Sequence, residues 1–150
     1  MRIVIQRVKQ ATVHIDHVLY NSIGEGLLLL LGIEETDTDA DIDWLTSKVV
    51  NLRIFDDHNG IMNRSICEMK GQILVISQFT LHAATRKGNR PSYIRAATHA
   101  KALPMYEQFC KTLELKLKDT VKTGVFAANM QISLINDGPV TILIDTKNKE

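Results

Sequence analysis

Residues 130–144, Met-Gln-Ile-Ser-Leu-Ile-Asn-Asp-Gly-Pro-Val-Thr-Ile-Leu-Ile, decide the fold of this 150-residue chain. Runs 130–135 and 140–144 are typical of β-strands, and they flank the turn-forming stretch Asn136-Asp137-Gly138-Pro139. Gly138 accepts a positive φ without steric cost, whereas Pro139 has no N–H and stiffens the corner. The stretch therefore predicts two strands joined either by an ordinary hairpin turn or by a rigid corner whose carbonyls face a ligand.

A second polar segment, Ser77-Gln78-Phe79-Thr80-Leu81, follows the apolar strand predicted at 73–76. Alternation along a strand would place Gln78, Thr80 and His82 on one face, which invites a nucleophile–base pair of Thr80 and His82. Side chains two positions apart on a strand are about 6–7 Å apart, which is too far for a direct hydrogen bond. Two interpretations stay open: a simple strand end, or one wall of a site shared with residues 136–141.

Periodicity and turn residues outline an α+β fold in a single domain, residues 1–150. Helices are predicted from Thr36 or Asp37 to Asn51, and from Thr98 to Leu117. Strands are predicted at 2–8, 11–16, 19–24, 25–33, 52–55, 61–62, 72–81, 120–124, 129–136 and 139–145. Because hairpins join strands at both ends of the chain, we expect a strongly curved, barrel-like, mainly antiparallel sheet with the two helices on its outside.

Composition indicates a globular protein of a reducing compartment. Hydrophobic residues make up 45% of the chain and charged residues 23%, so it can bury a core without metal or disulfide support. Cys67 and Cys110 lack a CxxC spacing and are expected to be free thiols. The longest apolar run, Leu27–Leu31, is too short to span a membrane, and the first residues do not form a signal peptide. We expect a soluble, cytoplasmic protein with no membrane partner.

Charge is distributed unevenly along the chain. No Asp or Glu occurs between Glu68 and Glu107, whereas acidic residues crowd positions 34–43. The acid-free interval carries the basic residues Lys70, Arg86, Lys87, Arg90, Arg95 and Lys101. Such a cluster suits a ligand that bears phosphate groups. A solvated loop balanced by the acidic start of a helix explains the pattern equally well.

The common catalytic motifs are missing from the sequence. It holds no P-loop and no GxGxxG, GxSxG or HExxH pattern. His14 and Asp16 share a strand face but lack a third ligand, so a surface hairpin explains them better than a metal site does. We predict no metal and no cofactor. If the chain is an enzyme, backbone groups or the substrate itself must do much of the chemistry.

The two polar segments, 77–81 and 136–141, resemble the two signature motifs of the D-aminoacyl-tRNA deacylases, also called D-tyrosyl-tRNA deacylases. The resemblance extends through nearly the whole chain. Further matching segments are residues 5–8, 24–32, 51–55, 87–92 and 124–130. The resemblance implies a homodimeric proofreading enzyme that hydrolyses the ester between a D-amino acid, or glycine, and the 3′-terminal adenosine of tRNA.

The resemblance also implies roles for individual residues. Gly138 and Pro139 would be joined by a cis peptide bond, and their carbonyls would enter the active site of the partner subunit and exclude L-amino acids. The remaining assignments are Gln78, Phe79 and Thr80 in the catalytic pocket with Ser77 beside them, Phe126 and Met130 against the adenosine or aminoacyl group, Arg7 bracing the Gly-Pro turn, and Arg86, Lys87 and Arg90 on tRNA phosphates. Phe79 distinguishes the chain from a related deacylase type that has a small residue there and a trans Gly-Pro.

The mechanism expected from the resemblance is substrate-assisted: the ribose 2′-hydroxyl takes part, and backbone N–H groups hold the oxyanion. Thr80 is then not an obligate nucleophile, which agrees with the lack of a base within its reach. Two alternatives remain, a non-catalytic RNA-binding module that uses the basic loop and a hydrolase of small nucleotide esters. Only the deacylase predicts loss of the ester from tRNA with a preference for D- over L-amino acids.

Overall fold

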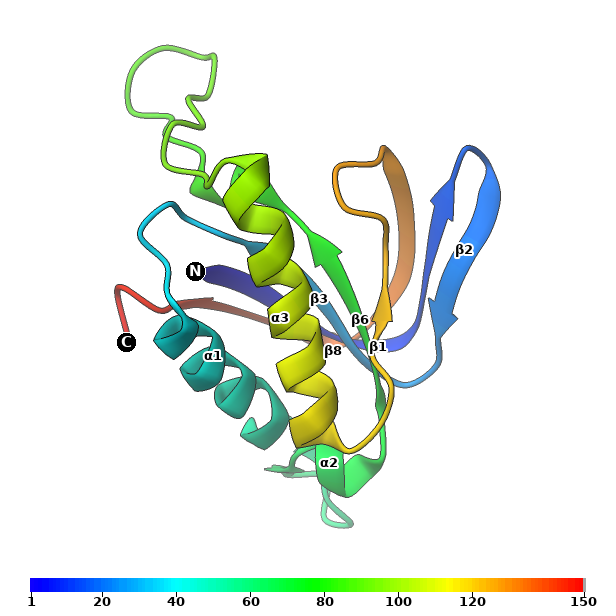
Figure 1. Cartoon of the computed structure of the whole chain (residues 1–150). Helices are drawn as coiled ribbons and strands as arrows, with labels where there is room; N and C mark the ends of the chain where they lie inside the picture. The colour runs from blue at the N-terminus through cyan, green and yellow to red at the C-terminus, as the bar shows by residue number, and fades with distance from the viewer. Residues whose placement is uncertain (150) are drawn as a thin grey trace.

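Strand β1 (Arg2–Ile15) organises the sheet because three other strands pair with it, all antiparallel. Its first half pairs with β3 (Gly26–Gly32), and its second half pairs with β2 (Val18–Ile23). Strand β8 (Met130–Asp145) pairs with both halves. The structure, a computed structural model, describes residues 1–149, and Figure 1 shows β1 crossing the molecule behind the helices.

The sheet is mixed and nearly closed. Strand β3 pairs in parallel with β6 (Gln72–Ser77), which pairs in parallel with β7 (Lys122–Thr123). The Asn21 side-chain amide on β2 donates to the Thr123 carbonyl on β7 at 2.7 Å, so the two ends of the strand order lie next to each other. The expected barrel-like sheet is therefore present, with two of its strand pairings parallel.

Helices α1 (Asp39–Asn51) and α3 (His99–Leu117) are the two predicted helices, and they pack side by side against one face of the sheet (Figure 1). Thr38 and Asp41 form a capping box at the start of α1. A third, short helix, α2 (Ile66–Met69), was not predicted, although Ser65 and Glu68 form a capping box there too. Strands β4 (Phe55–Asp56) and β5 (Met62–Arg64) form the predicted hairpin.

Strand β3 lies between two hydrophobic clusters because its side chains alternate between them. Leu27 and Leu29 pack with α1 and α3, whereas Leu28 packs with Leu74 and Ile76 on the other face. Gly26 permits the close approach of β3 to β6, since a Cβ there would lie 1.8 Å from the Gln72 carbonyl oxygen. The central strands are therefore fixed on both faces.

The segment 136–141 is not a hairpin turn, so the prediction of two separate strands was wrong here. Strand β8 runs through it, and its two halves pair with the same strand: Asn136 lies opposite Val8, and Thr141 lies opposite Gln6. Residues 137–140, which we call the corner, therefore bulge out opposite Arg7 alone. Local turn chemistry cannot reveal that β1 continues past the bulge.

The strand predicted at 72–81 ends at Ser77. The Gln78 N–H bonds to the Leu31 carbonyl at 2.7 Å, and residues Phe79–His82 then form a 3₁₀ turn, η1. The expected alternation of Gln78, Thr80 and His82 on one strand face was therefore wrong, and His82 is buried at 1% exposure. No helix within the described residues has both the length and the apolar character needed to cross a membrane.

Candidate active site

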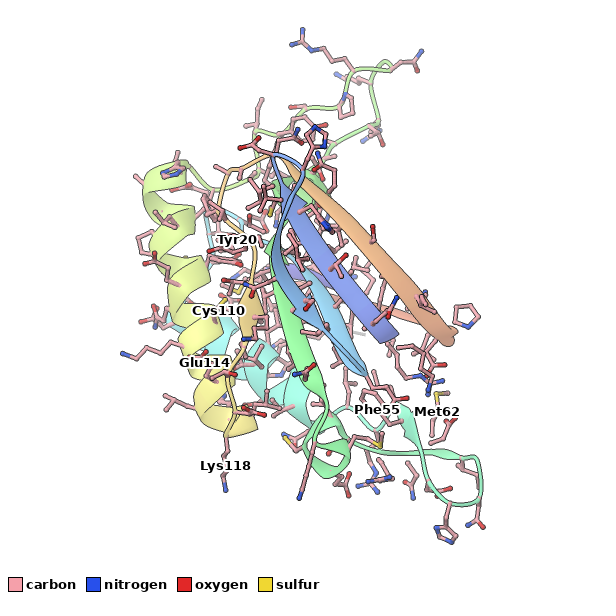
Figure 2. All side chains as sticks on the ribbon, turned by 90° about the vertical axis from the view of Figure 1, so that its right-hand side faces the viewer. Tyr20, Phe55, Met62, Cys110, Glu114 and Lys118 are labelled. Atoms are coloured by element: carbon pink, nitrogen blue, oxygen red, sulfur yellow. The ribbon has the colours of Figure 1, made fainter. Side chains whose placement is uncertain are left out.

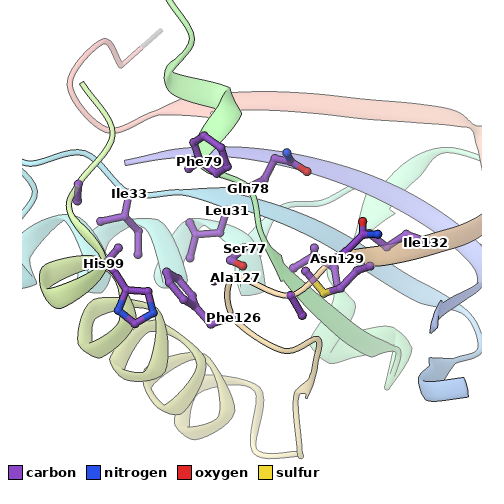
Figure 3. Close-up of a pocket in the computed structure, with 15 residues that line it drawn as sticks. Leu31, Ile33, Ser77, Gln78, Phe79, His99, Phe126, Ala127, Asn129 and Ile132 are labelled. Carbon is purple, nitrogen blue, oxygen red and sulfur yellow. The ribbon is translucent and has the colours of Figure 1, made fainter. Parts of the chain in front are cut away.

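A pocket of about 450 Å³ opens where β3 and β6 end against the start of α3. Figure 3 shows Phe79 on one side of it and His99 and Phe126 on the other. Five predicted site residues line this pocket: Ser77, Gln78, Phe79, Phe126 and Met130. The two sequence segments that carry them, 77–79 and 126–130, are thus brought together by the fold.

The end of β6 supplies the polar wall of the pocket. The Gln78 side-chain amide donates to the Thr80 hydroxyl at 2.5 Å, so Thr80 supports Gln78 and is not itself a lining residue. The first hydrogen bond of η1 runs from the Leu81 N–H to the Gln78 carbonyl. The N–H groups of Phe79 and Thr80 come before that bond in the turn, so no carbonyl of the turn accepts from them.

Residues 124–130 form the opposite wall, and a glycine sets their position. A Cβ at Gly124 would lie 2.4 Å from the Met130 sulfur and 3.0 Å from Ile76 Cδ1, so only glycine leaves room for Met130. The Phe126 ring packs against Tyr106, with ring centroids 5.6 Å apart. The Tyr106 hydroxyl donates to the Val75 carbonyl at 2.8 Å, and burial raises the pKa of Tyr106, so this phenol stays neutral.

Two polar residues that line the pocket, His99 and Asn129, were not predicted from the sequence. His99 is the first residue of α3, and its ring meets Phe126 edge-on at 5.2 Å. The only sequence signal for His99 was its position within the acid-free interval, next to the basic residues. Within the described residues, no three His, Cys, Asp or Glu side chains gather to hold a metal ion.

The corner lies apart from this pocket. Gly138 and Pro139 are exposed, and the bond between them is cis, as the resemblance implies. Arg7 is only 6% exposed and contacts the corner from β1. Its Nε donates to the Asp137 carbonyl at 3.3 Å and lies 3.2 Å from the Asp137 carboxylate. Its Nη1 donates to the Ile54 carbonyl at 2.7 Å. Across the bulge, the Asn136 amide donates to the Thr141 hydroxyl at 3.1 Å.

The basic residues lie on a loop, residues 83–97, that projects beyond the sheet and α3 (Figures 1 and 2). Arg86, Lys87 and Arg90 are exposed, and none of them takes part in an ion pair or side-chain hydrogen bond within residues 1–149. Arg95 differs, because its guanidinium binds the Glu34 carboxylate at 2.7 Å. Arg86, Lys87 and Arg90 are therefore open to a ligand, and Arg95 anchors the base of the loop.

The family model for D-Tyr-tRNA(Tyr) deacylases matches residues 4–145 of the chain. The chain belongs to this family. Proteins named D-aminoacyl-tRNA deacylase from Bacteroides fragilis (strain YCH46) and Bacteroides thetaiotaomicron are 63% and 61% identical to it over 150 residues, covering 100% of each chain.

Two solved structures share the fold. One described as a c-Myc DNA unwinding element binding protein superposes with a TM-score of 0.92 at 36% identity, over 97% of this chain and 98% of its own. One described as a probable eukaryotic D-amino acid tRNA deacylase reaches a TM-score of 0.82 at 16% identity, over 95% and 97% of the two chains. These matches confirm the family resemblance, the barrel-like α+β fold and the expectation that the chain is a hydrolase of the deacylase class.

Proposed function

We propose that the chain hydrolyses the ester that joins a D-amino acid to the 3′-terminal adenosine of tRNA, and that it also accepts glycine. The observation that carries this proposal is the pocket, in which a polar strand end faces a mainly apolar cavity, in a member of the deacylase family. Its volume of about 450 Å³ lies within the range of small-molecule sites. Ser77, Gln78 and Asn129 can orient polar groups of the substrate, while Phe126 and Met130 offer apolar contact.

The chemistry proposed for this pocket is substrate-assisted. Among the described residues that line the pocket, His99 alone has an ionisable side chain, and the Thr80 hydroxyl is hydrogen-bonded to Gln78. The 2′-hydroxyl of the terminal ribose therefore hydrogen-bonds to the water that attacks the ester carbonyl. The N–H groups of Phe79 and Thr80 donate to the oxyanion that forms. A substrate ending in 2′-deoxyadenosine should be hydrolysed poorly, while His99→Gln should keep kcat. A large loss of kcat in His99→Gln with an active deoxy substrate would make His99 the base.

The corner can act in this reaction only if it comes from a second copy of the chain. Neither Gly138 nor Pro139 lines the pocket, and Ile132 is the last residue of β8 that does. Extended backbone rises by 3.3 Å per residue, so residues 132–136 alone span about 13 Å before the corner begins. Ile135 and Leu143 on β8 are 52% and 66% exposed, which gives a second copy an apolar strand to cover. We therefore propose a homodimer with its active sites at the subunit interface.

In this arrangement the corner selects the chirality of the substrate. Backbone carbonyls beside the substrate α-carbon would collide with an L-side chain, whereas a D-side chain points away and glycine has none. The test compares hydrolysis of matched D-, L- and glycyl-tRNA by the wild type. Fast loss of the D-ester and the glycyl ester with slow loss of the L-ester is expected. Equal rates for D- and L-esters would end the proposal.

Mixing two inactive variants tests the shared site directly. Phe126→Ala removes a pocket wall, and Gly138→Ala distorts the corner, since Gly138 has a φ of +114° and a Cβ there would lie 3.0 Å from Arg7 Nη2. If pocket and corner come from different subunits, each mixed dimer regains one intact site. Equal mixing with free exchange should restore about a quarter of the wild-type sites, because half of the dimers are mixed. No recovery in dimers shown to exchange subunits would assign both parts to one chain.

Arg86, Lys87 and Arg90 are proposed to contact phosphates of the acceptor end, because they are exposed and lie within the acid-free interval. Each phosphate contact on a single strand adds about 0.7 to the slope of log affinity against log salt. Lys87→Ala with Arg90→Ala should weaken tRNA binding and flatten that slope, whereas Lys111→Ala, an exposed lysine on α3, should do neither. An unchanged slope in the double variant would place the tRNA on another face.

A non-catalytic nucleic-acid-binding role is the second candidate. The exposed cations of residues 83–97 favour it, as does the likeness to a structure described as a c-Myc DNA unwinding element binding protein. The two roles differ in one product. Binding of nucleic acid with no release of amino acid from D-aminoacyl-tRNA would support the binding role and remove the enzymatic one.

A further inference from the structure

Two exposed aromatic rings lie at the rim of the pocket, beside the basic loop. Phe79 lines the pocket and is 57% exposed, and Tyr93 on the loop is 38% exposed. Their rings meet edge-to-face with centroids 5.0 Å apart. Large aromatic groups that face solvent beside a ligand site are typical of surfaces that a ligand covers.

The loop holds Tyr93 in a defined place. Ala84 and Ser92 pair as an isolated antiparallel bridge, with N–H to carbonyl distances of 2.8 and 3.0 Å, so the residue just before Tyr93 is fixed. Two residues after Tyr93, Arg95 binds Glu34, and its carbonyl accepts from the Glu35 N–H at 3.3 Å. Tyr93 therefore sits between two anchored points, next to the tip that carries Arg86, Lys87 and Arg90.

Aromatic rings next to free cations are the combination that binds unpaired nucleic acid, since bases stack on the rings while cations follow the phosphates. The terminal adenosine would occupy the pocket itself. The next unpaired nucleotide must leave the pocket across its rim, and the cations that can neutralise its phosphate lie on the Tyr93 side. Charge complementarity therefore favours RNA over an apolar protein segment as the occupant.

Resting on the deacylase function proposed above, we propose that Phe79 and Tyr93 form a stacking platform for the nucleotide that directly precedes the terminal adenosine of tRNA. Tyr93 is then a substrate-binding residue that reads the RNA and not the amino acid. Its contribution exists only for substrates longer than one nucleoside.

The test compares a D-aminoacyl-tRNA with the same D-amino acid esterified to the 3′-hydroxyl of adenosine alone. Tyr93→Ala should raise KM for the tRNA by about tenfold, as expected from the loss of one stacked base, with kcat unchanged. Hydrolysis of the adenosine ester should keep its wild-type KM and kcat. Tyr93→Phe, which keeps the ring, should behave as wild type on both substrates, and Tyr93→Leu, which keeps only apolar bulk, should behave as Tyr93→Ala.

Tyr20→Ala is the matched control, because Tyr20 is 50% exposed on β2 and lies outside the pocket. A second readout places the fluorescent base 2-aminopurine before the terminal adenosine of an uncharged RNA end. Its fluorescence should be quenched on binding to the wild type and far less with Tyr93→Ala.

Three outcomes would overturn the platform. An equal loss on both substrates would mean that Tyr93 shapes the pocket through Phe79 or contacts a partner subunit. Unchanged kinetics on both substrates would mean that the rim carries no nucleotide, as would fluorescence that is quenched equally by wild type and Tyr93→Ala. A wild type that hydrolyses neither substrate would remove the deacylase function, and the fluorescence measurement would then still decide whether the platform binds RNA.

Discussion

The pocket and the corner are built in opposite ways, although both lie on strands of one sheet. The pocket is backed by the core: Ile76 and Leu31 at its floor are each 1% exposed, and β3 and β6 are fixed on both faces. The corner lies on strand β8, none of whose residues is fully buried. Hydrophobic burial positions the pocket, whereas one buried cation, Arg7, positions the corner.

This difference explains how a small chain can hold both the pocket and the corner rigidly. Packed side chains fix most of the pocket, but an exposed bulge has too little apolar surface for that. Arg7 supplies the missing constraint, since its planar guanidinium reaches the Asp137 carbonyl, the Asp137 carboxylate and the Ile54 carbonyl at once. Substitutions should therefore affect the pocket through side-chain packing and the corner through hydrogen bonds and charge.

The largest effect is expected at Arg7. Arg7→Met keeps much of the apolar volume but removes both contacts of Arg7 with Asp137. It also leaves the buried Ile54 carbonyl without its Arg7 partner. We expect a loss of about 2 kcal/mol in the free energy of unfolding. Misplacement of the corner by about 1 Å should lower kcat/KM for D-aminoacyl-tRNA by about 100-fold. Denaturant titration and deacylation assays measure the two quantities.

Lys9→Ala is the matched comparison, because Lys9 lies 3.4 Å from the same Asp137 carboxylate but is 51% exposed. Solvent screens such a pair, so Lys9→Ala should cost far less stability than Arg7→Met and leave activity nearly intact. If Arg7→Met keeps wild-type activity and its preference for D-esters, the corner does not depend on Arg7.

Gly124→Ala tests the pocket through packing alone. The new Cβ would fall 2.4 Å from the Met130 sulfur, and the flexible thioether must move, with the open pocket as its nearest space. Overpacking of this kind costs about 1–3 kcal/mol. We expect KM for D-aminoacyl-tRNA to rise by about tenfold, the usual scale of one misfitted apolar contact.

Shortening Met130 should relieve this effect. In the double variant Gly124→Ala with Met130→Val, the smaller side chain leaves room for the alanine methyl, so most of the lost stability should return. Thermal unfolding of the single and double variants decides the matter. Equal stabilities of the two variants would show that the strain lies in the backbone and not at Met130.

Much of the pocket could be predicted from the sequence because its signals are local. Apolar runs and turn residues located β3 and β6, Thr98 marked the start of α3, and the segment 77–81 carried its polar residues in one piece. His99 and Asn129 were missed because, apart from the position of His99 just after the basic loop, the residues around them in the sequence do not show whether a side chain lines a pocket or faces solvent.

The corner was predicted less well because its structure depends on a strand far away in the sequence. Asn-Asp-Gly-Pro has the chemistry of a turn, but β1 runs uninterrupted past it and keeps both halves of β8 paired. The 3₁₀ turn after Ser77 was missed for a similar reason. A Cβ at Gly32 would lie 2.9 Å from the Gln78 carbonyl oxygen and 3.1 Å from His82 Cδ2, so a glycine on β3 makes room for the turn.

A smaller effect on stability is expected from pH, through His82 beside the pocket. His82 is buried behind the polar wall, and burial lowers its pKa below the usual 6.5, with partial compensation from the Gly32 backbone and Glu34. Just below pH 6.5, His82 therefore binds a proton in the unfolded chain but stays neutral in the folded chain. The stability contributed by neutral His82 is complete above pH 6.5 and is lost as pH falls through the lower folded pKa.

His82→Gln should reduce the slope of unfolding free energy against pH below 6.5, by at most about 1.4 kcal/mol per pH unit. His58→Gln, at an exposed position on the β4–β5 hairpin, is the control and should leave the slope unchanged. Denaturant titrations between pH 5 and 7.5 measure it. A slope that persists in His82→Gln would assign the acid sensitivity to other groups.

The smallest effect is expected at Thr80, the residue that most resembles a nucleophile. Its hydroxyl accepts from the Gln78 amide at 2.5 Å, lies outside the pocket lining and belongs to η1, so it does not face His82 across a strand. Thr80→Ala removes one acceptor from a half-buried amide, which costs about 1 kcal/mol and loosens Gln78. We expect kcat for D-aminoacyl-tRNA to fall by less than about tenfold, the equivalent of that hydrogen bond.

Gln78→Ala separates the two ways in which Thr80 could contribute. If Thr80 acts only by holding Gln78, then Thr80→Ala should have no further effect in a Gln78→Ala background, because the hydroxyl has nothing left to position. If Thr80 were the nucleophile, Thr80→Ala would instead lower the deacylation rate by the same large factor in either background. The wild type would also form a covalent ester on Thr80 that can be trapped by rapid quenching. Loss of more than about a thousandfold in Thr80→Ala, with the 2′-deoxy substrate still cleaved, would restore Thr80 as the nucleophile and move the centre of the chemistry from the substrate to the chain.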